Sequence, residues 1–140
     1  MVYNAAFFRA HEAYFLEVKK RFGEDVSLDV MRTVMENTLR KAYMEMGFKF
    51  GKPKEFARIV GRRDSAIGLD IAFTDVSDSH IIYEFHTDPF PGLKGHVAPE
   101  KLDATYMNFK VNFILGDNWR YNTIYHIWKD KLTRHIIEKK

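Results

Sequence analysis

The spacing of hydrophobic residues changes along the chain, and each change predicts a different element. Apolar residues recur at helical spacing over residues 3–22, 27–46 and 53–60, which predicts three helices in the first half of the chain. Gly23 follows the first stretch and is a typical helix stop, and Ser27 is a good N-cap for the second. The chain therefore begins as a helical unit.

Strict alternation of apolar and polar residues replaces the helical period between residues 67 and 86. Residues 67–74 and 80–86 each alternate, and the turn-forming residues 75–79 separate them. The two stretches predict an antiparallel hairpin. The segment Asp88–Gly92 then ends the second strand, because prolines cannot continue a central ladder.

The second half of the chain predicts a loop, a helix and one further strand. The loop 87–98 is about as long as compact domains tolerate without a functional reason. A helix runs from Pro99 to Gly116, a strand with aromatic residues on both faces covers 119–128, and residues 130–140 form a charged tail with a short helix at most. Aromatics on both faces place this strand inside the sheet or under a partner subunit, which makes a homodimer plausible.

This order of helices, hairpin, helix and strand predicts an α+β fold, with the N-terminal helices packed on one side of a small antiparallel sheet. No repeat, linker or low-complexity segment divides residues 1–140, so we expect a single domain. The composition, with 46% hydrophobic and 29% charged residues, is typical of a soluble globular protein. The N-terminus lacks the features of a signal peptide, and we expect a cytoplasmic protein without a membrane span.

Cysteine and charge content narrow the possible chemistry. The chain has no cysteine, which excludes disulfides, thiolate metal sites and cysteine nucleophiles. Its net charge of +3 is spread along the chain, so nucleic-acid binding is weakly supported. Arg58, Arg62 and Arg63 cluster around Gly61, and they suit either a phosphate or carboxylate ligand or a solvated face and loop.

Four residues resemble a metal or acid–base site in their chemistry: His86, Asp88, His96 and His126. Imidazoles with a carboxylate suit Zn or non-haem Fe, although the spacing matches no metalloenzyme signature and scattered loop histidines are usually surface residues. A general acid–base pair of His86 with Asp88 or Glu84 is the alternative, if the loop closes over a substrate. The serines have no nucleophile-elbow context.

A small-molecule pocket between the long helix and the sheet is a second possibility. Pockets are mostly apolar and aromatic, with a few polar groups that orient the ligand. His126 could complete such a lining, and asparagines within a helix invite explanation by ligand contact, although solvent exposure explains them equally well. The ligand-binding candidates are Tyr106, Asn108, Asn112, Trp119 and Tyr121.

The stretch from Gly68 to Trp128 resembles the L-2-amino-thiazoline-4-carboxylic acid hydrolase-like family, which is related to vinyl-reductase-type small-ligand-binding domains. The resemblance rests on the strand Gly68–Asp75, the turn Asp88–Pro91 and the segment Leu115–Trp119 before the last strand. The family has a Cys-Pro-aromatic turn after its second strand, and Asp88 stands where that cysteine would be. If thiols carry the chemistry in relatives, this chain cannot perform it in the same way.

The resemblance implies a domain that binds a small polar or carboxylate-bearing molecule and hydrolyses a C–N bond in it. In this interpretation His86 and Asp88 handle protons or a metal, and His126 faces them from the last strand. Tyr106, Asn112 and Trp119 position the ligand. The alternative hypotheses are a non-catalytic dimeric sensor or interaction module and, last, a weak nucleic-acid binder.

Overall fold

The computed structural model describes residues 3–140, and it begins with three helices. These are α1 (Ala5–Phe22), α2 (Glu24–Met46) and α3 (Pro53–Ala66). The predicted N-cap at Ser27 is wrong, because α2 already begins at Glu24. The Ser27 hydroxyl instead donates to the Phe15 carbonyl at 2.6 Å, and this buried hydrogen bond joins α2 to α1.

Helix α3 extends beyond its predicted end at residue 60 and includes Arg62 and Arg63. The predicted loop around Gly61 is therefore wrong. A Cβ atom at Gly61 would lie 3.2 Å from the Phe73 ring, so the glycine allows α3 to approach the sheet closely without ending the helix. Arg63 is consequently held on a rigid element.

The sheet contains four antiparallel strands in the order β1-β2-β4-β3. Strands β1 (Ile71–Val76) and β2 (His80–Phe85) form the predicted hairpin, although β1 begins at Ile71 and not at residue 67. The remaining strands are β3 (Trp119–Tyr125) and β4 (Thr133–Lys139). The α+β prediction is confirmed, with one strand more than expected.

The predicted charged tail is strand β4, which pairs with both β2 and β3 in the interior of the sheet. Thr133, His135 and Ile137 are buried, and the residues between them are half-buried. Strand β3 consequently lies at the edge, so its predicted interior position is wrong. Its aromatic residues are divided accordingly, with Trp119 buried and Tyr125 exposed.

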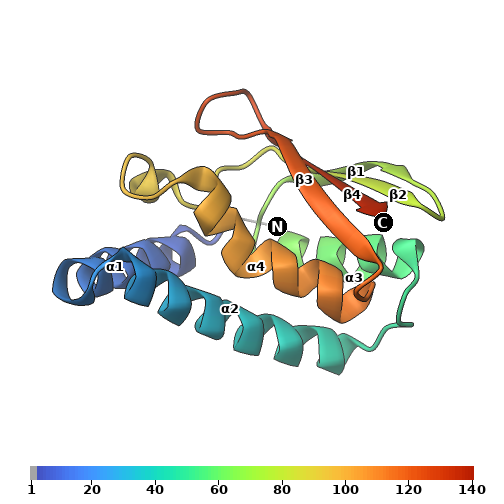
Figure 1. The fold of residues 1–140 in the computed structure, drawn as a ribbon, viewed down its shortest axis with the longest axis horizontal. Coiled ribbons are helices and arrows are strands. Elements are labelled where there is room, and N and C mark those ends of the chain that lie inside the picture. The colour runs from blue at the N-terminus through green and yellow to red at the C-terminus, as the bar shows by residue number, and fades with distance from the viewer. Residues whose placement is uncertain (1–2) are drawn as a thin grey trace.

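All four helices lie on one face of the sheet, and α4 (Pro99–Ile114) passes between α2 and the strands (Figure 1). The loop before α4 contains a short 3-10 helix, η1 (Pro91–Leu93), which contacts α1. One hydrophobic cluster joins the helices to the inner face of the sheet. Within residues 3–140, no helix combines the length and the hydrophobicity needed to cross a membrane.

Candidate functional site

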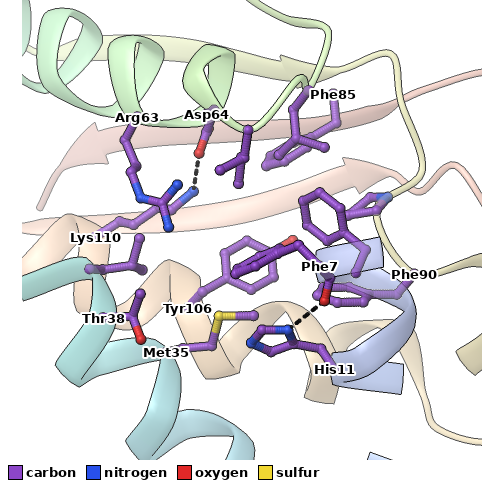
Figure 2. A pocket seen from close by; sticks show the side chains of 15 residues that line it. Phe7, His11, Met35, Thr38, Arg63, Asp64, Phe85, Phe90, Tyr106 and Lys110 are labelled. Carbon is purple, nitrogen blue, oxygen red and sulfur yellow. Dashed lines mark hydrogen bonds and ion pairs between the residues drawn. The ribbon is translucent and has the colours of Figure 1, made fainter. Parts of the chain in front are cut away.

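A largely apolar pocket lies between the helices, the end of strand β2 and the loop that follows it (Figure 2). Its volume is about 50 Å³, and it is partly open to the surroundings. Phe7 and His11 contribute from α1, Met35 and Thr38 from α2, and Tyr106 from α4. Aromatic walls of this kind suit the apolar part of a small organic ligand.

One end of the pocket holds a buried ion pair. The Lys110 ammonium, on α4, lies 3.4 Å from Oδ1 of Asp64, at the end of α3, and donates to the Tyr83 hydroxyl at 3.0 Å. The Tyr83 hydroxyl in turn donates to Oδ2 of Asp64. All three side chains are buried, so the charges are separated from water and depend on one another for hydrogen bonds.

Burial also changes the acidity of this cluster. It lowers the pKa of the Lys110 ammonium, and it does so against the attraction of Asp64, while the positive charge of Arg63 lowers that pKa further. Three aromatic rings surround the ammonium, with centroids 5.2 Å away for Tyr83, 5.5 Å for Phe85 and 5.0 Å for Tyr106. These faces favour a cation at the nitrogen.

Arg63 enters the same end of the pocket from α3, and Figure 2 shows its side chain beside Lys110 and Asp64. Within residues 3–140, its guanidinium forms no ion pair. Asp64 is shared with Lys110, so two cations face one carboxylate. The Tyr43 hydroxyl is buried without a hydrogen-bond partner among the described residues. It lies near enough to Arg63 and Asp64 to interact electrostatically with both charges.

Contacts with α1 hold the loop that forms one wall of the pocket. The buried carboxylate of Glu12 accepts a hydrogen bond from the Gly92 amide at 2.7 Å and pairs with Arg9 at 2.5 Å. Arg9 also donates to the Pro89 carbonyl at 2.8 Å. These bonds position Pro89 and Phe90 against the pocket.

The predicted residues Asp88 and His126 meet at a second, smaller cavity behind this wall. It has a volume of about 10 Å³, room for about one water, and Tyr106 and Phe90 line both cavities. Burial raises the pKa of Asp88, while the Phe90 amide, the Trp128 indole N–H and His126 oppose this effect. The Asp88 carboxylate accepts the Phe90 amide at 3.0 Å, so it also stabilises the local turn.

His126 lies beside Asp103, a buried residue that the sequence did not single out. Nδ1 of His126 accepts the Trp128 amide at 3.2 Å, and Nε2 lies 3.5 Å from Oδ1 of the buried Asp103. Tyr106 donates to the same oxygen at 2.9 Å, whereas Oδ2 of Asp103 has no partner among the described residues. Asp103 and His126 also line a wider pocket of about 190 Å³ beside β3.

The other two candidate metal ligands lie elsewhere. His86 is exposed and pairs with Glu84 at 3.2 Å, whose side chain also pairs with Arg134. His96 is an exposed loop residue. In the part of the chain that the structure describes, no group of three or more histidine and acidic side chains is placed to hold a metal ion.

The predicted ligand-binding residues likewise lie in different parts of the structure. Tyr106 lines the apolar pocket. Asn108 and Asn112 lie on the exposed face of α4 and line neither cavity, which agrees with the solvent-exposure alternative. Trp119 and Tyr121 lie on the inner face of β3, where Tyr121 packs against the His135 ring.

Sequence reasoning named Arg63 in a basic cluster but missed the other two charged residues of the pocket, Lys110 and Asp64. Lys110 lies four residues after Tyr106 and eight after Leu102, on the apolar face of α4, and a lysine in that register was the available signal. Asp64 gave no comparable signal, because α3 was expected to end before it. Sequence comparison found no matching protein-family model and no significant match to a curated protein.

Proposed function

We propose that this chain binds a small molecule with a carboxylate and an apolar body in the pocket between α1, α2, α4 and β2. The observation that carries the proposal is the Arg63 side chain, which lines this largely apolar pocket and forms no ion pair with any carboxylate of residues 3–140. An arginine fork matches a carboxylate in geometry and charge. The resemblance to a family named for a carboxylate substrate supports the same class of ligand.

The shape of the pocket indicates how such a ligand would lie. The volume of about 50 Å³ would admit the carboxylate end, and the apolar body would extend along Phe7, Phe90 and Tyr106 toward the open side. Binding would bring one negative charge to an end of the pocket with two cations and one carboxylate. The net charge there would fall to zero, which favours binding in a poorly solvated site.

Titration calorimetry with benzoate and small aliphatic acids, with their neutral amides as controls, tests this proposal. We expect the acids to bind and the amides to bind at least about tenfold more weakly, because a charge-assisted hydrogen bond contributes about 1.5–3 kcal/mol. The Arg63→Gln variant should bind the acids no more tightly than the amides. Arg62→Gln is the matched control, because Arg62 is exposed and directly precedes Arg63 on the same helix. Equal binding by Arg63→Gln and wild type would contradict the proposal.

We also propose, more specifically, that the Asp103–His126 pair serves the C–N hydrolysis implied by the resemblance. The Trp128 amide occupies Nδ1, which favours the tautomer with the proton on Nε2, directed to Asp103. Asp103 would orient the ring, and the wider pocket beside β3 would admit the substrate. In this arrangement Asp88 would contribute only by stabilising the turn that it forms with Phe90, and His86 would have no role.

The hydrolysis proposal is tested with L-2-amino-thiazoline-4-carboxylate and related cyclic amidines, with product detection by mass spectrometry. His126→Gln and Asp103→Asn should each abolish turnover. His86→Gln should leave it unchanged, because His86 pairs with Glu84 away from both cavities. Turnover that survives His126→Gln, or no turnover by the wild type, would reject this reaction while leaving ligand binding at Arg63 intact.

A further inference from the structure

We propose that Lys110 is an imine-forming residue, whose amine condenses with the carbonyl carbon of a 2-oxo acid held in the apolar pocket. The inference rests on the proposed function, since the carboxylate of the 2-oxo acid would occupy the place assigned to Arg63. Lys110 lines the pocket, and its nitrogen contacts both an acid and a hydroxyl. Among the described lysines, Lys110 alone is buried.

Only a neutral amine attacks a carbonyl, and two features of the surroundings make that form of Lys110 more accessible than in an exposed lysine. Burial penalises the ammonium, and the nearby Arg63 guanidinium adds repulsion. Asp64 lies 3.4 Å from the nitrogen and can accept its proton, which turns a buried ion pair into two neutral groups. Lysines desolvated in this way, beside another cation, are activated as nucleophiles.

Lys110 and Asp64 can carry every proton transfer that imine formation needs. The ammonium gives one proton to Asp64, and the free amine adds to the ketone carbon to form a C–N bond. The proton that remains in excess on nitrogen moves to the former carbonyl oxygen, which gives a carbinolamine. Asp64 then returns its proton to that hydroxyl, the C–O bond breaks, and one water leaves with the oxygen. The product is a cationic iminium beside an ionised Asp64.

The pocket is built to stabilise that cation. The rings of Tyr83, Phe85 and Tyr106 lie with centroids 5.0–5.5 Å from the nitrogen, within the range of cation–π attraction. Asp64 regains its negative charge as the iminium forms, so the ion pair of the free protein is restored. Tyr83 supplies a hydroxyl at 3.0 Å that bridges the nitrogen and Asp64.

A 2-oxo acid fits both charged side chains at once. Its carboxylate and ketone carbons are adjacent, and Arg63 and Lys110 lie at the same end of the pocket (Figure 2). Binding of the carboxylate at Arg63 would therefore present the ketone to Lys110. An iminium next to a carboxylate withdraws electrons from the bond between them, so such a complex is suited to reactions at that carbon.

Reductive trapping tests the inference. The full chain is incubated at pH 7 with phenylpyruvate and cyanoborohydride, and the adduct is located by peptide mass spectrometry. We expect one adduct, at Lys110, because each unit by which an amine pKa falls raises its neutral fraction about tenfold. Benzoate should compete, and Arg63→Gln should label more slowly than Arg62→Gln. Lys110→Arg, which keeps the charge, should give no adduct.

Wild-type mapping decides the outcome even if the Lys110 variant folds poorly. Adducts spread over exposed lysines such as Lys101, with Lys110 unmodified, would overturn the inference. Benzoate titration separates this failure from that of the proposed function, because benzoate has no ketone and needs only Arg63. Benzoate binding without labelling of Lys110 rejects the imine alone, whereas the absence of both rejects the pocket as an acid-binding site.

Discussion

At the scale of single residues, the Lys110–Asp64–Tyr83 cluster is the most unusual feature of the core. A buried ion pair seldom adds stability over an apolar replacement, because desolvation offsets the attraction between the charges. Its presence at the end of a pocket therefore points to a role in binding or chemistry. The clusters around Asp103 and His135 are polar as well, but they form fewer hydrogen bonds among the described residues.

Removal of one member of the pair should be costly. Lys110→Met leaves Asp64 buried with a single hydrogen-bond donor, and we expect a loss of about 3–5 kcal/mol in the free energy of unfolding. Lys101→Met is the control on the same helix, where an exposed ion pair contributes about 0–1 kcal/mol. Urea denaturation measures both. If the free energy of unfolding fell no more for Lys110→Met than for the control, the result would contradict a buried ion pair between Lys110 and Asp64.

His135 should make stability depend on pH. Burial lowers its pKa from 6.5 to about 4, against the attraction of Asp103 and with the repulsion of Lys110 and His126. The unfolded chain therefore binds more protons between these values, so this contribution to stability is present above pH 6.5 and is lost as pH falls toward 4. The loss amounts to about 3 kcal/mol.

Urea denaturation of His135→Asn across this pH range checks the expectation. The variant should be less stable at pH 7 and should show a smaller decrease in stability between pH 6.5 and pH 4 than the wild type. His96→Gln, which changes an exposed histidine, should retain the full decrease. An unchanged decrease in His135→Asn would show that another group is responsible.

The sequence identified some site residues and missed others for a common reason. Tyr106 follows a clear helical period, so its inward position was predictable. His126 follows the end of β3, so its predicted place within the last strand is wrong, and Asp88 meets it because the loop after β2 packs against the connection between β3 and β4. No local spacing encodes this long-range contact. Asp64 and Lys110 are separated by 46 residues, and their pairing depends on the packing of α3 beside α4.

At the scale of elements, the segment from residue 87 to residue 98 is held in place mainly by α1. Gly92 is essential to this attachment, because a Cβ atom there would lie 2.7 Å from Oε1 of Glu12. Gly92→Ala should break the bond between the Gly92 amide and Glu12 and leave a carboxylate underpaired, at a cost of about 1–3 kcal/mol. Thermal denaturation measures this cost.

The same substitution should weaken acid binding, because Pro89 and Phe90 form a wall of the pocket. Lys94→Ala is the control in the same loop, where the side chain is exposed. A Gly92→Ala protein with wild-type stability and affinity would show that the contact between the loop and α1 does not shape the pocket.

Elements with a strong local period were predicted well, and those determined by packing were not. α1, α4 and β2 follow their patterns closely, whereas α2 and β1 begin at other residues than the patterns predicted. Strand β4 also alternates, with Thr133, His135 and Ile137 inward, but its charged residues concealed that pattern. Its central place depends on pairing with two other strands. β2 is remote in sequence, and β3 lies on the other side of a turn.

At the scale of the whole molecule, an apolar groove between α1 and α2 is exposed. Tyr14 is 70% exposed and Val30 and Val34 are each 43% exposed, and all three line this groove. Exposed apolar patches often mark contacts between proteins. The homodimer predicted from the sequence is thus better placed on this helical face than over the aromatic strand.

Light scattering coupled to size exclusion tests this prediction. We expect a dimer for the wild type and a monomer for Val30→Lys, because a charge would be buried in the interface. Thr33→Lys, which changes a residue that does not line the groove, should remain dimeric. A wild-type monomer at all concentrations would contradict the dimer without affecting the pocket.

The central claim is that small acids bind between α1, α2, α4 and β2, and amide chemical-shift mapping during a benzoate titration tests it most directly. The account predicts the largest shifts at Thr38, Arg63, Ile67, Leu69 and Lys110, with saturation, and the loss of these shifts in Arg63→Gln. Shifts confined to the region of Asp103, His126 and Lys129, or none at saturating benzoate, would contradict it.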